Sequence, residues 1–454
     1  MNIGGNSFMS ERAKKVLRYF EEQKDYVNAR VRSGIELYRK GTMRIRVTDE
    51  NGQPVSGAVI DARQVTQQFK FGANTFMVDE METPEKNEIY KTKFAEIFNL
   101  GTIPFYWNTL EPVEGQPRFS KESPRIYRRP PIDKCVEYCL QNGIEPKLHC
   151  LNYDYYSADW LWSRSTRERK EKLVKRFAEL AEHYAAIIPM VEVMNESLCG
   201  YSHCSEFFWD DDFVEWSFHE AQKFFPASEL IINESAIHWD APNAHTNRNP
   251  YYQQIEKLLE KKLPVHGIGL QFHSMFHEDR EAEVLAKRDG RYCPEYLCAV
   301  MDKFEQLNLP MQITEMSIPS YTYDPEDEDI QAEILKNVYS LFFAQRSMEA
   351  ICYWNFPDGY AHLAEPGDMT CGENYFRAGL MRFDMTEKPA YKALKKLIRE
   401  DWMTDTRLIT DEDGYAVLRG FHGDYELTVH ANEKTAASKM KLGAGMNQRC
   451  NLNV

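Results

Sequence analysis

The sequence predicts an α/β fold, a (β/α)8 TIM barrel with a small β-sandwich built from N- and C-terminal segments. Two observations favour the barrel. Eight short apolar stretches alternate with charged, helix-like stretches, and the centres of successive apolar stretches lie 32 to 46 residues apart. This spacing is typical of repeated strand–helix units around a parallel barrel. A third observation favours the sandwich. Near both ends of the chain, apolar and polar residues alternate with a period of two, which predicts antiparallel strands.

The segments outside the barrel come first along the chain. Residues 1–40 are expected to form an N-terminal helical segment. Residues 41–68 alternate in the manner of strands around a turn signal, Asn51–Gly52. The stretch GYAVLRGFHGDYELTVHA near the C-terminus predicts a β-hairpin. Because neither segment alone has enough strands to bury a core, we expect residues 41–68 and 405–454 to build one β-sandwich.

The barrel is expected over residues 69–404. Pro lies in the expected first turn of the helix in PEKNEIYKTKFAEIFN, where its missing N–H is tolerated. The acidic run Asp324 to Asp329 is better explained as a helix start, which the helix dipole favours, than as a cation site. We expect the eight strands to be centred near Gly72, Pro104, Lys147, Val193, Ile231, Gly269, Ile313 and Cys352.

Composition narrows the classes of partner and cofactor. The chain has 454 residues and a net charge of −15, which argues against nucleic acid and anionic membrane surfaces as partners. The ten cysteines include no CxxC pair, and CGYSHC (199–204) lacks a second half at zinc-site spacing, so no metal and no cofactor are expected. No apolar run reaches membrane-spanning length, and the first residues lack a signal pattern. Two locations stay open: the cytoplasm, or secretion with a signal peptide absent from this sequence.

Polar or aromatic residues follow most of the predicted strands. In barrels of this kind, functional side chains lie at the carboxyl ends of the strands. A polar residue at one strand end has an ordinary structural explanation, but six strands that converge in this way favour a site. The residues are His149 after the third strand, Asn195 and Glu196 after the fourth, Asn233 and Glu234 after the fifth, Gln271 and His273 after the sixth, Glu315 after the seventh and Trp354 after the eighth.

Two of these residues carry carboxyl groups that suit glycoside hydrolysis. That reaction needs one protonated carboxyl to supply a proton to the leaving oxygen and one ionised carboxylate to attack the anomeric carbon. Glu196 and Glu315 lie at the ends of different strands and can supply this pair. An adjacent amide such as that of Asn195 can bind the sugar 2-OH, a contact that strengthens in the transition state.

The chain also resembles glycoside hydrolase family 10, the retaining endo-β-1,4-xylanase family, over roughly residues 69–400. Five blocks carry the resemblance, in order: FGAN on the first strand, W-x3-EP-x2-G (107–115), MNE (194–196), GIGLQFH (267–273) and ITEMSI (313–318). The resemblance implies that Glu196 is the acid/base and Glu315 the nucleophile. It further implies that Asn195 holds the 2-OH, that Gln271 and His273 support Glu315, and that His149 contacts the sugar next to the scissile bond.

Several positions depart from the family pattern. The Glu–Asn pair and the Lys that hold the non-reducing-side sugars in the family are absent from the stretch GTIPFYW. We expect Trp354, Tyr106 and Tyr153 to contact substrate. The departures are Thr102, Ile103 and Tyr106 on the second strand, Tyr153 and Asp154 after the third strand in place of Trp–His, and His362 in place of a second Trp after the eighth strand.

The expected function is therefore retaining β-glycoside hydrolysis, by an endo-β-1,4-xylanase acting on xylan or xylo-oligosaccharides by double displacement. The alternative is a β-glycosidase for a different plant β-glycoside or a short oligosaccharide, with rewritten glycone subsites. A third hypothesis is a carbohydrate-binding protein on an inactive barrel. The presence of Glu196, Glu315, Asn195 and His273 argues against that third hypothesis. In each case the expected partner is a carbohydrate.

Overall fold

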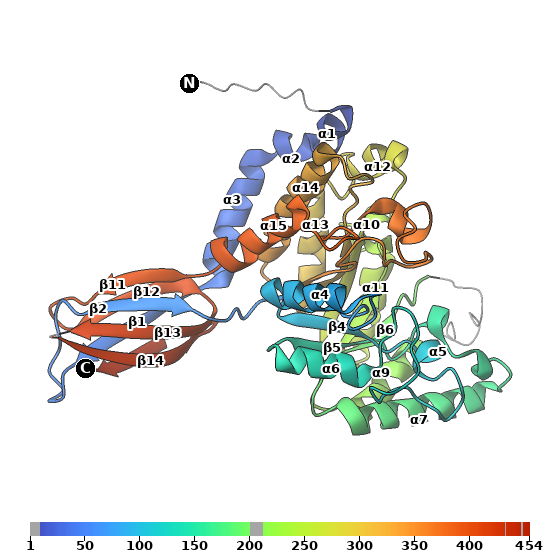
Figure 1. Ribbon diagram of the computed structural model, residues 1–454, viewed down its shortest axis with the longest axis horizontal. Helices are drawn as coiled ribbons and strands as arrows, with labels where there is room; N and C mark the ends of the chain where they lie inside the picture. Colours follow the sequence, from blue (N-terminus) through green and yellow to red (C-terminus); the bar gives the residue numbers. More distant parts are fainter. Residues whose placement is uncertain (1–9, 200–211, 432, 446–447) are drawn as a thin grey trace.

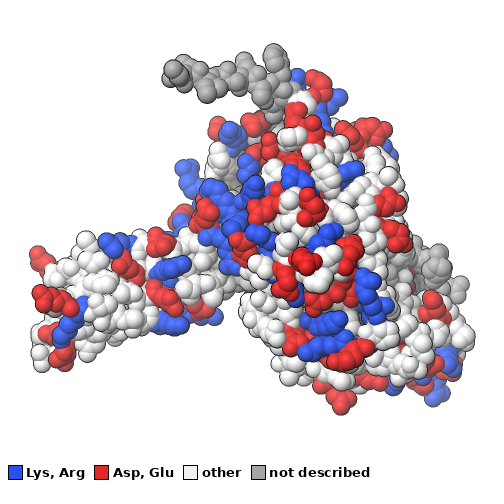
Figure 2. Space-filling view, in the orientation of Figure 1, with Lys and Arg blue, Asp and Glu red and all other residues white. Residues whose placement is uncertain are grey.

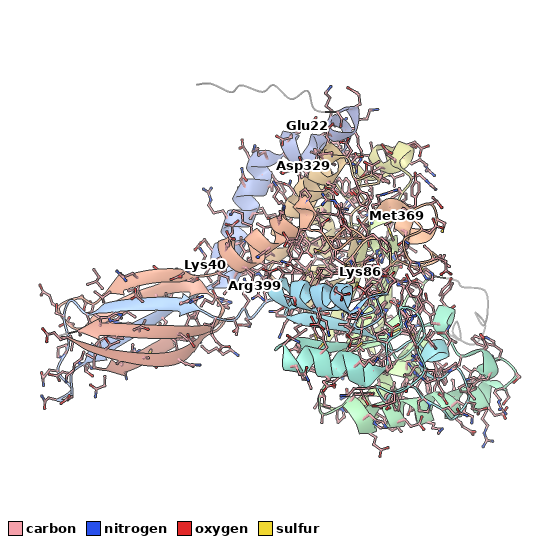
Figure 3. All side chains as sticks on the ribbon, in the orientation of Figure 1. Glu22, Lys40, Lys86, Asp329, Met369 and Arg399 are labelled. Atoms are coloured by element: carbon pink, nitrogen blue, oxygen red, sulfur yellow. The ribbon has the colours of Figure 1, made fainter. Side chains whose placement is uncertain are left out.

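The computed structural model describes residues 10–199, 212–431, 433–445 and 448–454. Figure 1 shows a barrel surrounded by helices, with an elongated β-domain beside it. The N-terminal helices lie against the outside of the barrel and lead into the β-domain. Figure 3 marks this junction, where Lys40 and Arg399 lie close to the start of the β-domain.

Eight parallel strands form a closed barrel in the order β10-β3-β4-β5-β6-β7-β8-β9, which confirms the predicted (β/α)8 architecture. Each strand lies close to its predicted centre except β4, where Pro104 is the last residue and not the centre. The bounds are β3 Lys70–Asn74, β4 Leu100–Pro104, β5 Glu145–His149, β6 Met190–Asn195, β7 Glu229–Glu234, β8 Gly267–His273, β9 Met311–Ser317 and β10 Met348–Tyr353.

Helices cover the outside of the barrel, and several begin at the residues that the sequence suggests. Thr83 and Ser165 cap α4 and α7 with their side chains, and Asp324 caps α14 by accepting from the N–H of Glu326. The acidic run therefore begins a helix, as predicted. The helices are α4 Pro84–Ile97, α5 Trp107–Leu110, α6 Ile132–Gln141, α7 Thr166–Tyr184, α9 Phe213–Phe224, α10 Ile237–Asp240, α11 Pro250–Glu260, α12 Glu278–Leu285, α13 Pro294–Glu305, α14 Pro325–Ala344 and α15 Pro389–Lys396.

The N-terminal helices are packed closely onto the barrel. They are α1 Glu11–Val16, α2 Arg18–Glu22 and α3 Lys24–Gly34, followed by a π-helical turn, Ile35–Arg39. Arg12 forms a 2.9 Å ion pair with the buried Glu281 at the start of α12. Gly34 lies so close to α14 that a Cβ there would be 2.2 Å from the carbonyl oxygen of Ala344. A side chain at this position would force the two helices apart.

The interior of the barrel is layered. Near the amino ends of the strands, an apolar cluster fills the barrel with Leu100, Met190, Ile231, Ala350 and Cys352. The next layer is polar, because the ammonium of Lys147 on β5 contacts both Glu192 on β6 and Gln312 on β9. The apolar layer closes one end of the barrel. Polar side chains therefore become available to a ligand at the carboxyl ends of the strands.

The small β-domain consists of two packed sheets. One sheet has the order β12-β1-β15 and the other β11-β2-β13-β14. Their facing sides bury a separate core that includes Ile45, Ile60, Leu418 and Leu427. The strands are β1 Lys40–Thr48, β2 Val59–Gln64, β11 Asp405–Ile409, β12 Tyr415–Phe421, β13 Gly423–Ala431, β14 Lys434–Leu442 and β15 Gln448–Asn453.

The predicted C-terminal hairpin is wrong. Strand β12 pairs with β1, whereas β13 pairs with β2 and β14, so the two strands lie in different sheets. The chain crosses between the sheets at His422 and Gly423, where a Cβ on Gly423 would be 1.9 Å from the carbonyl oxygen of Thr66. Pairing with distant strands lets both apolar faces meet in one core, which a two-stranded hairpin cannot build.

Charged side chains of both signs are interspersed over the visible face of the molecule (Figure 2). Many of them form exposed pairs one helical turn apart, such as Lys175 and Glu179 on α7. None of the described helices combines the length and the apolar character needed to cross a membrane.

Candidate active site

A cavity of about 450 Å³ opens at the carboxyl ends of the barrel strands. It collects residues from the end of nearly every strand or from the loop that follows it. Of the predicted site residues, His149, Asn233 and Glu234 do not line it. The lining residues are Phe76, Tyr106, Arg128, Arg129, Tyr153, Tyr155, Tyr156, Asn195, Glu196, Ser235, Ala236, Ile237, Gln271, His273, Glu315, Trp354, His362 and Glu373.

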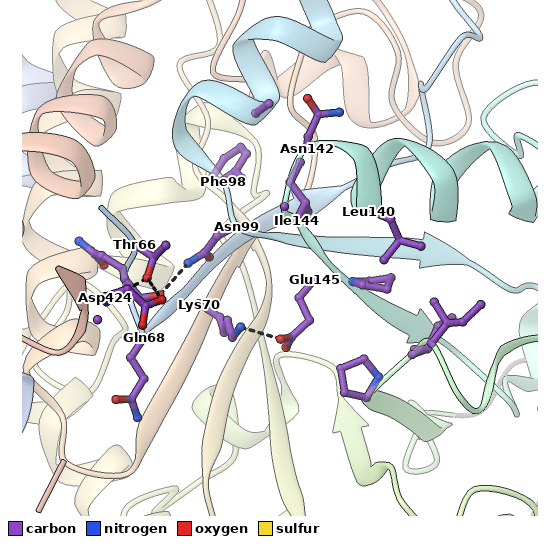
Figure 4. Close-up of a pocket in the computed structure, with 18 of the residues that line it drawn as sticks. Thr66, Gln68, Lys70, Phe98, Asn99, Leu140, Asn142, Ile144, Glu145 and Asp424 are labelled. Carbon is purple, nitrogen blue, oxygen red and sulfur yellow. Dashed lines mark hydrogen bonds and ion pairs between the residues drawn. The ribbon is translucent and has the colours of Figure 1, made fainter. Parts of the chain in front are cut away.

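A larger cavity of about 910 Å³ lies at the opposite end of the barrel, next to the β-domain. Figure 4 shows Lys70, the first residue of β3, and Glu145, the first residue of β5, within it. The two side chains form a 2.7 Å ion pair, so their charges already neutralise each other. The catalytic hypothesis therefore concerns the smaller cavity, which lies where barrel enzymes carry their chemistry.

Glu196 follows β6 in a left-handed backbone conformation, with φ of +53°. Such a conformation is uncommon for a residue with a side chain and occurs where the surroundings determine it. Its carboxyl group is held at both oxygens: Gln271 donates to Oε1 at 2.8 Å, and the Tyr153 hydroxyl donates to Oε2 at 3.0 Å. Gln271 and Tyr153 thus hold the carboxyl of Glu196 at both of its oxygens.

Glu315 lies within β9 and has different partners. Asn233 donates to its Oε1 at 3.0 Å, and Nε2 of His273 lies 3.1 Å from its Oε2. Burial alone would lower the pKa of His273, but the hydrogen bond and charge of Glu315 outweigh burial and raise that pKa. The other ring nitrogen of His273 lies 3.0 Å from the Ser317 hydroxyl.

A chain of side-chain amides connects the two carboxyl groups. Asn233 donates to Oδ1 of Asn195 at 2.8 Å as well as to Glu315. Gln271 donates to the same oxygen of Asn195 at 3.3 Å as well as to Glu196. Because Oδ1 of Asn195 is occupied in this way, its Nδ2 is the atom that can donate to a sugar hydroxyl.

Two expected contacts are different in the structure. Gln271 was expected beside Glu315 but donates to Glu196, whereas His273, two residues further along the same face of β8, reaches Glu315. His149 was expected to contact the sugar but is 1% exposed and lies behind Tyr106, whose hydroxyl is 2.8 Å from its Nε2. Tyr106, and not His149, therefore forms the surface of the cavity at this point.

Below the cavity, His149 belongs to a buried charge cluster. Its Nδ1 is hydrogen-bonded to Glu192, and Lys147 contacts the other oxygen of the same carboxylate at 2.5 Å. Burial would raise the pKa of Glu192, but Lys147 and His149 lower it to about 2. Glu192 is therefore an ionised carboxylate beneath the site. It orients His149, and His149 in turn orients the hydroxyl of Tyr106.

Aromatic rings form one wall of the cavity. Trp354, Tyr106 and Tyr153 all line it, and Phe76 joins them with its ring 5.2 Å from that of Trp354. The ring of Trp354 is also 6.0 Å from that of His273, next to Glu315. Faces of aromatic rings are suitable surfaces for the C–H faces of sugars.

The positions that depart from the family pattern divide into two groups. Thr102, Ile103 and Asp154 are buried and do not line the cavity. His362 does line it, with Nδ1 3.2 Å from the hydroxyl of Tyr156.

Sequence reasoning missed Arg128, Arg129 and Glu373, which enter the cavity from loops between the predicted elements. A loop has no periodicity that marks which side chains point inward, and the adjacent arginines in RRPP were the only signal.

The W-x3-EP-x2-G block has a structural role beside the cavity. The indole N–H of Trp107 donates to Glu111 Oε2 at 2.8 Å, and the N–H of Gly115 donates to Oε1 at 2.6 Å. Glu111 thus ties α5 to the turn that follows it.

Among the described residues, no group of three or more His, Cys, Asp or Glu is placed to hold a metal ion. The segment CGYSHC (199–204) lies outside the described residues except for Cys199.

Comparisons with known proteins agree with this geometry. The profile of glycosyl hydrolase family 10 matches residues 62–397. The chain is 22% identical to endo-1,4-beta-xylanase 1 of Arabidopsis thaliana, over 94% of this chain and 42% of that protein. It is 24% identical to a beta-1,4-xylanase of Dictyoglomus thermophilum, over 62% of this chain and 83% of that protein. The chain thus spans less than half the length of the Arabidopsis relative.

Solved structures show the same fold. The crystal structure of xylanase 10B from Thermotoga maritima superimposes with a TM-score of 0.58 at 24% identity, covering 74% of this chain and 96% of that one. Xylanase 10B from Thermotoga petrophila RKU-1, in complex with xylobiose, gives a TM-score of 0.56 at 23% identity, covering 74% and 95%.

Proposed function

Because this chain belongs to glycosyl hydrolase family 10, we propose that it is a retaining β-glycoside hydrolase, an endo-β-1,4-xylanase acting on xylan or xylo-oligosaccharides. The observation that supports this most directly is the pair of carboxyl groups in one cavity with different partners. Glu196 is held by neutral donors, Gln271 and Tyr153. Glu315 is held by His273 and Asn233. Unequal surroundings of this kind divide two carboxyls into an acid and a nucleophile.

In the first step, Glu315 attacks the anomeric carbon of the sugar. The bond from that carbon to the leaving oxygen breaks, and Glu196 transfers its proton to that oxygen. The product of this step is a glycosyl ester on Glu315 and a free leaving group. Asn195 supports the step by donating from Nδ2 to the 2-OH, a contact that strengthens as positive charge develops on the ring.

In the second step, water replaces the leaving group. Glu196, now ionised, removes a proton from the water molecule as its oxygen attacks the anomeric carbon. The ester bond to Glu315 breaks, and Glu315 returns to its carboxylate form beside His273. Two inversions at the same carbon give net retention, and Glu196 is protonated again for the next cycle.

The aromatic wall positions the sugar for these steps. Trp354 and Tyr106 present ring surfaces next to Glu315, and the hydroxyl of Tyr106 is fixed by His149. Rigid ring surfaces orient a sugar with little loss of side-chain entropy. The small β-domain has no role in this proposal.

Two measurements test the proposal. The first is product analysis by mass spectrometry, with wild type and Glu315→Ala incubated with xylan and xylo-oligosaccharides. Only the wild type should shorten them, and NMR should show the β-anomer of the new reducing end first. Initial appearance of the α-anomer would contradict the retaining mechanism.

The second measurement detects the covalent intermediate. In Glu196→Ala, a xyloside with a dinitrophenolate leaving group needs no proton for the first step but lacks the base for the second. The glycosyl-enzyme should therefore accumulate, with the added mass on a peptide containing Glu315. Absence of the adduct from that peptide while dinitrophenolate is released would exclude Glu315 as the nucleophile.

A second candidate function keeps this chemistry and changes the substrate to another plant β-glycoside or a short oligosaccharide. The observation in its favour is the altered wall of the cavity, where Thr102 and Ile103 are buried away from it and Arg128 and Arg129 line it. A panel of small β-glycosides should accompany the xylan assay. Cleavage of one of them with xylan left intact would favour this candidate.

A further inference from the structure

Two adjacent arginines line the catalytic cavity, and the mechanism above does not use them. Arg128 and Arg129 follow α5 in the loop that leads to α6, and they are only 5% and 7% exposed. Burial of a guanidinium is unfavourable unless it has partners for its charge and its N–H groups.

The backbone is arranged so that both side chains reach the same cavity. In an extended segment, successive side chains point to opposite sides. Arg128 instead has φ of +59°, in the left-handed region that residues with side chains rarely occupy. Arg118 supports the turn by donating to the carbonyl oxygen of Arg129 at 3.0 Å and to that of Pro124 at 2.8 Å. The loop therefore holds two consecutive guanidiniums in an unfavourable conformation, which indicates a functional position.

Arg128 has polar neighbours that partly balance its positive charge. Its Nη2 donates to Asn355 at 3.3 Å, and Asn355 in turn donates to Glu373 at 2.9 Å. Burial would raise the pKa of Glu373, but the charges of Arg128 and His273 outweigh it and lower that pKa. Glu373 is thus an ionised carboxylate on the Arg128 side of the cavity.

Arg129 is instead surrounded by aromatic rings, including that of Tyr156, whose centre is 5.1 Å from its guanidinium carbon. Its guanidinium carbon lies 4.3 Å from the ring centre of Tyr106 and 5.0 Å from that of Phe76. It donates from Nη1 to the carbonyl oxygen of Arg128 at 2.8 Å, while its Nε finds no acceptor in the described part of the chain. In the described part of the chain, Arg128 donates to Asn355 and Arg129 to a carbonyl oxygen, and neither acceptor carries a charge. Ring faces stabilise a cation but provide no hydrogen-bond acceptor with a full charge.

The position of Arg129 is close to the reacting sugar. The ring of Phe76 separates it from Trp354, and the ring of Trp354 lies next to His273, the partner of Glu315. A group bound at Arg129 therefore belongs to the sugar that Glu315 attacks or to its immediate neighbour. The two glutamates already have donors, so the Nε donor of Arg129 remains for the substrate.

We propose that Arg129, assisted by Arg128, binds a carboxylate on the substrate, so that the preferred substrates are β-glycosides with a uronic acid substituent. A guanidinium presents parallel N–H donors that match the two oxygens of a carboxylate. The bound carboxylate would satisfy the Nε donor and balance the buried charge. The inference rests on the proposed function for the cleavage step and goes beyond it in naming the substituent.

The test compares two substrates that differ in the charge of one carboxyl group and in one methyl group: a xylo-oligosaccharide with one glucuronic acid branch and the methyl ester of the same compound. Because hydrogen bonds to a charged group are strong, we expect the wild type to prefer the acid by about 10- to 100-fold in kcat/KM. In Arg129→Gln this preference should fall toward one, and Arg129→Lys should retain part of it. Arg167→Gln, at an exposed position on α7, should keep the wild-type preference.

Equal kcat/KM for acid and ester with the wild type would overturn the inference and leave the proposed function intact. A stronger preference for a sulfated oligosaccharide than for the uronate would overturn the assignment of a carboxylate. Calorimetry with Glu315→Ala separates binding from cleavage. Tighter binding of the acid in the absence of any turnover by the wild type would sink the proposed function and keep the binding site. The comparison of acid and ester with the wild type needs no variant. It therefore tests the inference even if Arg129→Gln does not fold.

Discussion

Gln271 donates a hydrogen bond of 2.8 Å to Oε1 of Glu196, and thereby connects the end of β8 to the residue that follows β6. The same amide also donates to Asn195, so the side chain proposed to hold the 2-OH and the carboxyl proposed as acid/base share one support. Glu315 receives none of the hydrogen bonds from Gln271 and relies on His273 and Asn233. The two carboxyls therefore have different direct partners, although Asn195 connects those partners to each other.

Tyr153→Phe should lower kcat/KM about 10-fold or more, because the variant loses the hydroxyl that donates to Glu196 at 3.0 Å. A hydrogen bond to an ionisable group contributes about 1.5–3 kcal/mol, and 1.4 kcal/mol is a factor of ten. Steady-state kinetics on xylo-oligosaccharides measures the effect. Tyr38→Phe, at an exposed position far from the cavity, should leave kcat/KM unchanged. An active Tyr153→Phe enzyme with wild-type kcat/KM would show that the contact has no role in the reaction.

His273→Gln should reduce stability more at pH 6 than at pH 8. The pKa of His273 is raised in the folded protein, chiefly by Glu315, which more than offsets burial. A raised folded-state pKa contributes stability that is fully present below the unfolded value of about 6.5 and is lost as pH rises through the folded value. Thermal unfolding of both proteins at several pH values measures the difference.

The control for this experiment is His219→Gln on α9, where the side chain is exposed. Its stability difference from wild type should stay near zero throughout. A gap between wild type and His273→Gln that widens as the pH rises would contradict the expected sign.

Lys147→Met should destabilise the protein by about 3–5 kcal/mol, because it leaves the buried carboxylate of Glu192 without its cation. Lys147 and His149 outweigh burial and lower the pKa of Glu192 to about 2. This depressed value contributes stability above the unfolded pKa of about 4.3, and that stability is lost as pH falls toward 2. The wild-type advantage should therefore shrink in acid.

Denaturant unfolding at pH 7 and pH 3 measures this prediction. Lys175→Met, where the lysine pairs with Glu179 on the surface of α7, is the matched control and should cost only about 0.5 kcal/mol or less. A similar loss in the free energy of unfolding for the two lysine variants at pH 7 would show that the buried cluster stabilises the protein no more than a surface ion pair does.

Gly423→Ala should destabilise the β-domain by about 1–3 kcal/mol, since the new Cβ would meet the carbonyl oxygen of Thr66 at 1.9 Å. Gly443→Ala is the matched control, because a Cβ there would approach only the Gln448 side chain, at 3.4 Å. Hydrogen exchange of β12 and β13 reports the local effect. Unchanged protection in Gly423→Ala would mean that the crossing between the sheets tolerates a side chain.

Much of the barrel could be predicted from the sequence, because its strands and helices follow local rules. The buried strand that ends at Asn195 is uniformly apolar apart from Glu192, and α14 begins at the acidic run after Asp324. Parallel strands of a closed barrel bring their carboxyl ends together, so Glu196 and Glu315 could be expected in one cavity. The pairing of β12 with β1 could not be predicted from the turn that follows β12. It depends on burying the apolar sides of strands that are far apart in the sequence.

By itself, the sequence determined the strand–helix rhythm, the strand ends and the two carboxyls, since each depends on residue type and short-range spacing. Only the tertiary structure decided that Gln271 supports Glu196, that His149 lies behind Tyr106 and that Arg128 and Arg129 enter the cavity. These contacts join residues far apart in the chain or lie in a loop without periodicity. Their geometry follows from how the barrel closes and how each loop is anchored, which no local pattern records.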